Sequence, residues 1–240
     1  NGYINSTSIM TNCDYFNEAI HGLKVRKDLK VGIHLNLTYG KSLNSSLIFS
    51  DTNGFFNLNY LQLFYKSIFS NHFLEKVEGE FELQIQKAIQ NNIDISHLDS
   101  HRHIHLIPSI YKIVYGLSTK YNIRRVRLVN ENIFHSLKLT KKINFFMNGG
   151  LLKYFLLKIF TIFNKLHGNK YENISFYSIL YTGVIGRTSL HKLMSSNAFY
   201  EIVVHPSCIN LDKDVTFYND AEKAYRLSAN RSLELLGILK

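Results

Sequence analysis

The chain has 240 residues, of which 45% are hydrophobic and 13% aromatic, so it suits one α/β domain with a sizeable core and excludes long disordered spans. Its 28 lysines and arginines against 18 aspartates and glutamates leave a net charge of +10, but the basic residues are scattered without an RNA-binding or helix-turn-helix pattern, so we expect no nucleic-acid partner. The two cysteines, Cys13 and Cys208, exclude a disulfide framework and favour a reducing, cytoplasmic compartment.

The first elements expected are a strand over residues 4–12, a helix over 15–23 with Asp14 as its cap, and a strand over 31–38. In the last of these, apolar side chains alternate with polar ones, which predicts one buried face and one chemical face. A lone histidine in a strand is most often structural, but His34 shares its face with two other hydrogen-bonding side chains. It is therefore a candidate site residue.

A helical pattern over residues 61–90 follows, and we expect the glutamates on it, Glu80 among them, to lie on a solvated face. The next stretch, residues 93–108, holds four of the eleven histidines. Its β-branched residues begin a buried strand, and Pro108 fits the first turn of a helix. The polar side chains at the junction of this strand and helix are Asp99, His101, His103 and His105.

This junction predicts a metal site, because α/β enzymes bind ligands at the carboxyl ends of their strands and neutral imidazole is a common ligand of divalent metals. The nearby carboxylate of Asp99 either ligates directly or accepts the other ring N–H of a histidine. The alternative is that some of these histidines only cap the helix or form hydrogen bonds in the core.

Further strands are expected over 123–129 and 201–205. Arg127 on the first makes either a surface ion pair or a substrate contact, and His205 ends the second, directly before a proline. A terminal amphipathic helix over 222–239 completes an alternation of strands and helices that implies a mainly parallel sheet or a barrel.

The helical stretch over 138–167 is almost wholly apolar in its second half, although it carries several lysines. It is too short and too charged to span a bilayer. A helix packed on the core is the favoured interpretation, and the alternatives for residues 151–163 are contact with a membrane surface or a homodimer interface.

Three segments in this order resemble the YdjC-like carbohydrate deacetylases: GIHLNLTYG at 32–40, HLDSHRHIHLIP at 97–108 and VVHPS at 203–207. Secondary matches extend the resemblance over nearly the whole chain: TSIM at 7–10, NGFF at 53–56, YTG at 181–183 and RSLELL at 231–236.

The resemblance implies an α/β fold, a distorted (β/α) TIM-like barrel with mainly parallel strands, that removes the acetyl group from N-acetylated sugars. It further implies a divalent metal, Mg or Zn, held by two histidines and an aspartate. Carried over by motif, the two histidine ligands are His34 and His101, and His205 is the general acid that protonates the departing amine. Asp99 then orients a ligand, and Arg127 and His103 face the substrate.

The family opens with a strand that ends in an Asp-Asp pair, which supplies the third metal ligand and the base. This chain starts after that point, and Asp14, Asp28 and Asp51 do not stand in the corresponding motif. We therefore expect one deacetylase domain over 1–240 that is N-terminally truncated, lacks its first strand and Asp-Asp loop, and is inactive as it stands.

The function predicted is that of a metal-dependent hydrolase in carbohydrate metabolism, acting on an N-acetylglucosamine-type oligosaccharide or glycan precursor. One alternative is another metal hydrolase on the same barrel, such as a phosphoesterase or amidohydrolase. The other is a non-catalytic glycan-binding or membrane-peripheral pseudoenzyme.

Overall fold

A computed structural model of the chain describes residues 3–134, 136, 150–166, 174–177, 179–180, 185–194, 200–208, 223–224 and 227–239. The chain divides into two compact units. The first, called here the N-terminal unit, comprises residues 5–128 and 160–171; the second, the C-terminal unit, comprises residues 1–4, 129–159 and 172–240. The single domain expected over 1–240 stays a prediction, and the YTG motif at 181–183 lies outside the described residues.

The N-terminal unit contains a four-stranded sheet in which every neighbouring pair of strands is parallel. Its strands lie in chain order: β1 (Ser6–Ile9), β2 (Lys30–Leu35), β3 (Ile95–Ser100) and β4 (Arg125–Val126). The expected class, α/β with mainly parallel strands, is confirmed. All four strands end at the same edge of this sheet, so side chains at their carboxyl ends are brought together.

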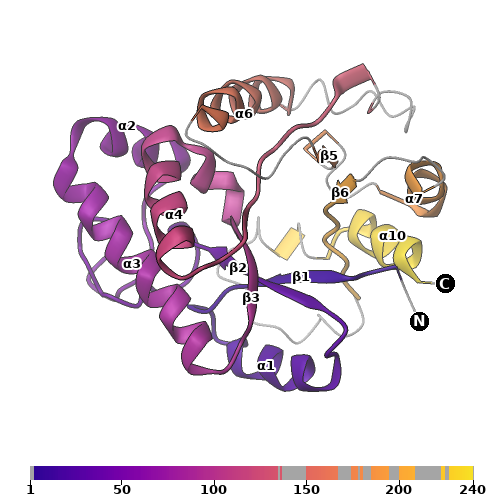
Figure 1. Ribbon diagram of the computed structural model, residues 1–240, viewed down its shortest axis with the longest axis horizontal. Coiled ribbons are helices and arrows are strands. Elements are labelled where there is room, and N and C mark those ends of the chain that lie inside the picture. Colours follow the sequence, from indigo (N-terminus) through magenta and orange to yellow (C-terminus); the bar gives the residue numbers. More distant parts are fainter. Residues whose placement is uncertain are drawn as a thin grey trace. The chain divides into compact units, whose positions relative to one another are not determined.

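Helices join these strands: α1 (Phe16–Val25), α2 (Tyr60–Phe69), α3 (Asn71–Gln90), the 3₁₀ segment η1 (His101–Leu106) and α4 (Pro108–Lys120). Figure 1 shows α3 and α4 side by side, and the two helices are in contact. Pro108 begins α4 as predicted, because its missing N–H would have no partner in the first turn. The cap expected at Asp14 is wrong, since Tyr15 precedes α1 and makes no side-chain cap bond.

The single helix expected over 61–90 is two helices. The Ser70 backbone is extended between them, and its hydroxyl accepts a hydrogen bond from the Phe73 N–H, which caps α3. The break lets α3 pack its apolar face on the sheet, and Phe81 and Ile85 of α3 are fully buried together with Ile33 of β2 and Leu98 of β3. This packing makes the sheet a rigid support for the residues at its edge.

The C-terminal unit contains two parallel strands, β5 (Ser175–Tyr177) and β6 (Tyr200–Ile202), with α7 (Arg187–Met194) and α10 (Ala229–Ile238). Figure 1 shows α7 and α10 as neighbours, and they are in contact. A Cβ at Gly237 would come within 3.1 Å of the Gly186 and Arg187 backbone, so glycine is needed for α10 to approach that closely.

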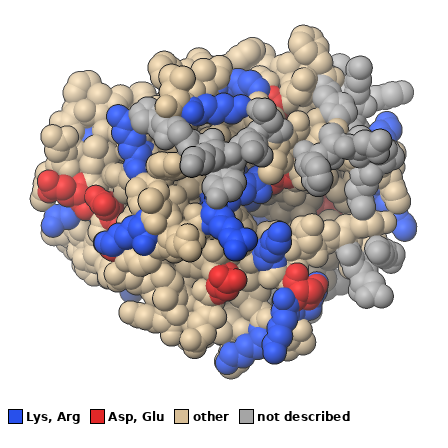
Figure 2. Space-filling view, viewed as in Figure 1, with Lys and Arg blue, Asp and Glu red and all other residues tan. Residues whose placement is uncertain are grey.

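The helix α6 (Gly150–Lys165) crosses the division between the two units, and the part of the predicted 138–167 helix before residue 150 lies outside the described residues. No helix in the part of the chain that the structure describes is both long enough and apolar enough to cross a membrane. Lysine and arginine side chains are spread over the face seen in Figure 2 and are not gathered in one patch, as the sequence indicated.

Candidate active site

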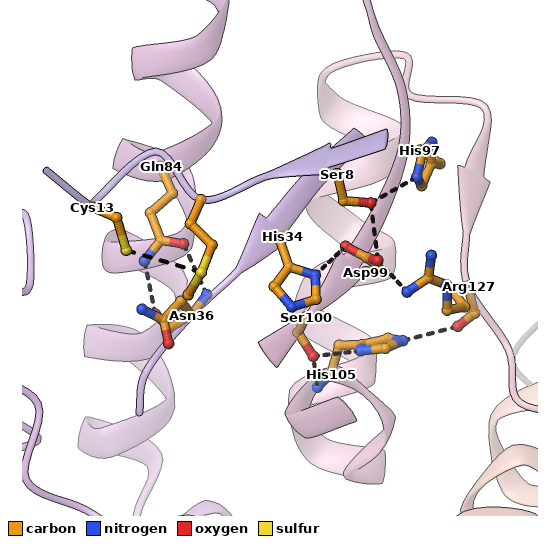
Figure 3. A network of polar contacts seen from close by, with 11 residues as sticks. Ser8, Cys13, His34, Asn36, Gln84, His97, Asp99, Ser100, His105 and Arg127 are labelled. Carbon is orange, nitrogen blue, oxygen red and sulfur yellow. Dashed lines mark hydrogen bonds and ion pairs between the residues drawn. The ribbon is translucent and has the colours of Figure 1, made fainter. Parts of the chain in front are cut away.

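The site at the sheet edge begins with a pair formed across two strands. The register of β2 and β3 sets His34 beside Asp99, and the His34 Nδ1 lies 2.9 Å from Asp99 Oδ1 (Figure 3). Asp99 is buried, whereas the His34 side chain is 24% exposed. A carboxylate only accepts hydrogen bonds, so Nδ1 carries the proton and the lone pair of His34 is on Nε2.

The other carboxylate oxygen of Asp99 is also occupied. Arg127, just after β4, forms a buried ion pair with Oδ2, and the Ser8 hydroxyl on β1 donates to the same oxygen at 3.0 Å (Figure 3). Burial alone raises the pKa of Asp99, but the charge of Arg127 and the hydrogen bond from His34 hold it well below its usual range. Asp99 is therefore a fixed anion on β3, held by residues of β1 and β2 and by the residue after β4.

His101 opens η1 directly after β3 and lies beside His34. Its ring is 6.0 Å from the His34 ring in an edge-to-face arrangement, and its Nδ1 is 2.8 Å from the Thr38 hydroxyl. The Tyr39 ring covers it at 5.9 Å. The structure thus brings together the two histidines that the sequence predicted as metal ligands, with the Nδ1 of each held by a protein oxygen.

The His34 imidazole suits a position at a divalent cation, because its Nδ1 donates to Asp99 and its Nε2 carries the lone pair, and His101 lies beside it with its Nδ1 next to the Thr38 hydroxyl. Among the described residues, no group of three histidine, cysteine, aspartate or glutamate side chains lies in metal-binding range. The residues present therefore fit two of the ligands of a metal.

His105 is the structural histidine of the cluster. Its Nδ1 is 2.5 Å from the Ser100 hydroxyl, and its Nε2 is 3.0 Å from the Arg127 carbonyl oxygen. Burial lowers the pKa of His105 to about 4, so the ring is neutral at pH 7 and donates from Nε2 to that carbonyl. For this histidine the alternative of a core hydrogen bond, which the sequence left open, is confirmed.

Backbone strain marks Arg102 and His103, which lie between His101 and the structural His105. Arg102 and His103 have φ values of 55° and 58°, in the left-handed region that residues with a Cβ rarely occupy. His103 is half-buried, its ring lies 6.5 Å from that of His105, and its predicted contact with substrate stays a prediction, as does that of Arg127.

Ser8 and His97 are parts of the site that the sequence analysis did not identify. The Ser8 hydroxyl lies 3.0 Å from His97 Nε2, and the Ser96 hydroxyl lies 2.8 Å from His97 Nδ1. The His97 ring also rests on Gly32, where an added Cβ would come within 2.3 Å of Nε2. The TSIM motif at 7–10 was the signal for Ser8, but its partners lie about ninety positions away in the sequence.

A second polar network supports the loop after β2. Gln84 of α3 forms two hydrogen bonds with the Asn36 backbone, and Glu80 accepts from the backbone N–H groups of Leu43 and Asn44. The expected solvated position of Glu80 is wrong: its side chain is fully buried, and burial raises its pKa. Helix α3 thereby holds the segment that carries Thr38 and so orients His101.

His205 belongs to the C-terminal unit and follows β6. Its backbone N–H donates to Glu234 at 2.6 Å, and its carbonyl accepts from Arg231 at 2.8 Å. Both partners are on α10, in the RSLELL segment that the sequence singled out.

Comparisons with known proteins point to one family. The model of the family described as YdjC-like protein matches residues 1–236. Curated relatives include a carbohydrate deacetylase of Clostridium beijerinckii, 31% identical over 143 residues that cover 58% of this chain and 56% of the relative. Carbohydrate deacetylase 1 of Listeria innocua is 35% identical over 138 residues, covering 57% of this chain and 55% of the relative. The chain thus spans about half the length of the curated relatives it matches.

A solved structure supports the fold. A protein from Enterococcus faecalis V583 that is named for cellobiose-phosphate cleavage superimposes with a TM-score of 0.61, covering 99% of this chain and 86% of that chain. The two sequences are 21% identical, so this likeness bears on the fold alone, which is the α/β fold expected of a distorted (β/α) barrel.

Proposed function

Because the chain belongs to the YdjC-like family, we propose that it is a carbohydrate deacetylase that hydrolyses the N-acetyl group of a saccharide to acetate and a free amino sugar. The observation that carries the proposal is the buried Asp99 carboxylate, which holds His34 with its Nε2 as the donor atom, beside His101. This arrangement is typical of a hydrolytic metal centre, in which outer carboxylates orient the histidine ligands. An N-acetylglucosamine-type oligosaccharide or glycan precursor is the substrate we propose.

The metal would be held by the Nε2 atoms of His34 and His101. A divalent cation such as Mg or Zn supplies, when bound, Lewis-acid activation of water and stabilisation of negative charge on the acetyl oxygen. Asp99 keeps His34 in the tautomer that leaves Nε2 unprotonated, and Thr38 orients the His101 ring. Arg127 holds Asp99 ionised, so that its carboxylate remains a hydrogen-bond acceptor for His34 Nδ1.

Amide hydrolysis also needs a proton on the departing nitrogen, because an amine anion is a very poor leaving group. We assign this step to His205, which in its protonated form transfers a proton to the amide nitrogen as the C–N bond breaks. The free amino group of the sugar then leaves as the neutral amine, with acetate as the second product.

Acetate release from N-acetylglucosamine oligomers by the full-length protein, measured with and without EDTA, tests this proposal. His34→Ala and His101→Ala should each lower the rate by at least about 100-fold and weaken binding of Zn²⁺ measured by calorimetry. His72→Ala is the matched control, since His72 lies exposed on α3, and it should keep both properties. Full acetate release from both site variants would contradict the proposal.

A different outcome of the same assay would favour another class of function. Saccharide binding with neither acetate release nor metal uptake would indicate the non-catalytic glycan-binding alternative. Phosphate release from a phosphorylated sugar in place of acetate would indicate a phosphoesterase.

We also propose that α6 rests on the surface of an anionic membrane. Its outer face carries a stripe of exposed apolar side chains spaced three and four residues apart: Leu152, Phe155, Ile159 and Ile162. Leu166, directly after the helix, continues this stripe. The opposite face is already packed on the protein, because Leu157 and Phe160 are buried and Phe160 stacks on Phe64 of α2. The helix has lysines but no acidic residue.

The charge of α6 distinguishes between the two candidates that could cover its apolar stripe, a membrane surface and a second copy of the chain. A second copy of the chain docked on the stripe would bring lysines of both α6 helices close together, with no carboxylate on either helix to pair them. Anionic lipid head groups complement the exposed Lys165 in the last turn of the helix, while the acyl region takes up the apolar stripe. Lys158 is held by the Asn130 side chain and the Glu131 carbonyl oxygen. The lipid surface is therefore the favoured occupant, and a homodimer is an outcome that the test below separates.

A further inference from the structure

The terminal helix α10 holds both backbone polar groups of His205. Glu234 Oε2 accepts the His205 N–H at 2.6 Å, and Arg231 Nε donates to the His205 carbonyl oxygen at 2.8 Å. Arg231 and Glu234 are three residues apart on α10, so their side chains leave the same face of the helix. One turn of α10 thus supplies a carboxylate for the His205 N–H and a guanidinium for the His205 carbonyl oxygen.

The Glu234 carboxylate is buried and therefore needs hydrogen-bond partners inside the protein. Its side chain is fully buried, and a buried carboxylate is costly unless it receives several hydrogen bonds. Its second oxygen accepts the Ile185 N–H at 3.4 Å, so the carboxylate joins the segment after β6 to the segment before α7. Both segments and α10 belong to the C-terminal unit.

The residues next to His205 are held by the same helix. The Ser207 N–H donates to the Arg231 carbonyl at 3.3 Å, and the Arg231 guanidinium reaches the Pro206 carbonyl at 3.5 Å. Pro206 has no N–H and a fixed φ, which further limits the movement of the segment. The close approach of Gly237 to the backbone at 186–187 fixes the position of α10 itself.

We infer that Arg231 and Glu234 are positioning residues that fix the backbone of His205 and thereby restrict the positions that its imidazole can take. With the N–H and the carbonyl both held, the Cα–Cβ bond of His205 has one direction, and only the side-chain torsions remain free. This inference rests on the proposed function, in which His205 is the proton donor. It assigns a role to the RSLELL segment, which the hydrolytic chemistry itself leaves unused.

The substitutions follow from the hydrogen-bond inventory of the two side chains. Glu234→Gln keeps the shape but replaces one acceptor oxygen by an NH₂ group, which meets a backbone N–H and cannot accept from it. Arg231→Met removes the donors, whereas Arg231→Lys keeps one charged donor. Asn230→Ala is the matched control, because Asn230 is exposed on the same turn of α10.

The kinetic arm measures acetate release from N-acetylglucosamine oligomers by the full-length protein and its variants. Glu234→Gln and Arg231→Met should lower kcat by about 10- to 100-fold with KM changed less than about twofold, because misplacing a catalytic group affects the transition state more than binding. Arg231→Lys should recover part of the loss, and Asn230→Ala should match the wild type. Equal falls in the folded fraction and in kcat, measured by circular dichroism, would show a purely structural role and overturn the inference.

A second arm reads the backbone of His205 without relying on activity. The short hydrogen bond to a carboxylate should give the His205 amide proton a strongly downfield NMR shift and slow exchange with solvent. Glu234→Gln should reduce both, and Asn230→Ala should leave them unchanged. If the full-length wild type releases no acetate, the proposed function fails, and the NMR signal of the His205 amide still tests the positioning role. An unchanged signal in Glu234→Gln overturns that role.

Discussion

The Asp99 carboxylate organises the site at the scale of single residues. One oxygen holds His34 and the other receives Ser8 and Arg127, so a single side chain orders contributions from β1, β2 and the residue after β4. Replacing one partner of such a buried pair leaves an uncompensated charge, which costs about 3–5 kcal/mol in typical cases. The arrangement is therefore rigid, as an orienting group for metal ligands has to be.

Gly32 is the residue whose size this arrangement limits most sharply. Gly32→Ala should lower the free energy of unfolding by about 1–3 kcal/mol, because the new Cβ would collide with the His97 ring at 2.3 Å. Gly22→Ala, on the exposed side of α1 with no atom within 4 Å of the added Cβ, should instead stabilise by about 0.5–1 kcal/mol. Urea unfolding of both variants checks the contrast, and equal stability would show that the His97 ring yields without cost.

Single residues also show what the local pattern predicts well. The alternation in residues 31–38 correctly set the side chains that flank His34 into the core, because the two-residue period of a strand is a local property. Glu80 was wrongly expected in solvent, since nothing in α3 indicates that its carboxylate would meet the backbone of residues 43–44.

At the scale of elements, α6 differs from an ordinary surface helix because both of its faces are apolar. One face is packed on the protein, and the other exposes side chains such as Leu152, which is 76% accessible, and Leu166, which is 78% accessible. The interpretation of a core-packed helix is thus confirmed for one face only. A helix of this type gains free energy by inserting the outer face into the interfacial region of a bilayer.

Sedimentation with vesicles tests the membrane contact of α6. The chain should sediment with vesicles rich in phosphatidylglycerol, less with pure phosphatidylcholine, and progressively less as salt rises, since screening weakens the lysine contribution. Leu152→Ser combined with Phe155→Ser should reduce the bound fraction by about tenfold or more, because two large apolar side chains leave the interface. Leu61→Ser, at an exposed position of α2, is the control.

Two outcomes would contradict the contact with lipid. Binding that is the same for the double variant and the wild type would place the membrane contact elsewhere. A dimer seen by sedimentation equilibrium in the wild type and lost in the double variant, without vesicle binding, would show that a second copy covers the stripe.

At the scale of the whole molecule, stability depends on pH through His105. Its folded pKa of about 4 lies below the unfolded value of about 6.5, so the unfolded chain takes up a proton first as the pH falls. Stability from this group is therefore full above pH 6.5 and is lost as the pH falls toward 4. Asp99 acts at lower pH. Because its folded pKa lies well below the unfolded value near 3.9, its contribution to stability is full above that value and is lost only in stronger acid.

The expected loss between pH 7 and pH 5 is about 2 kcal/mol from His105. His105→Gln, which still has a donor for the Arg127 carbonyl, should unfold more easily at pH 7 but show a pH dependence smaller by about that amount. The exposed His72→Gln should keep the wild-type dependence. Urea unfolding at pH 7 and pH 5 measures the free energy of unfolding of each protein. The same change between the two pH values in His105→Gln and in the wild type would refute the role of His105.

The sequence by itself determined the features that repeat locally or stand in motifs: the parallel strands with helices between them, the start of α4 at Pro108, and the family to which the chain belongs. It also singled out His34 and His101, which the sheet register brings side by side.

Only the tertiary structure decided which polar groups meet. The bonds of Ser8 to His97 and Asp99 join residues 89 and 91 positions apart, and the burial of Arg127 and Glu80 depends on packing between elements. The physical reason is that periodicity records which face of an element is buried, whereas a hydrogen bond between elements depends on register and on the position of each helix against the sheet, which no local pattern contains.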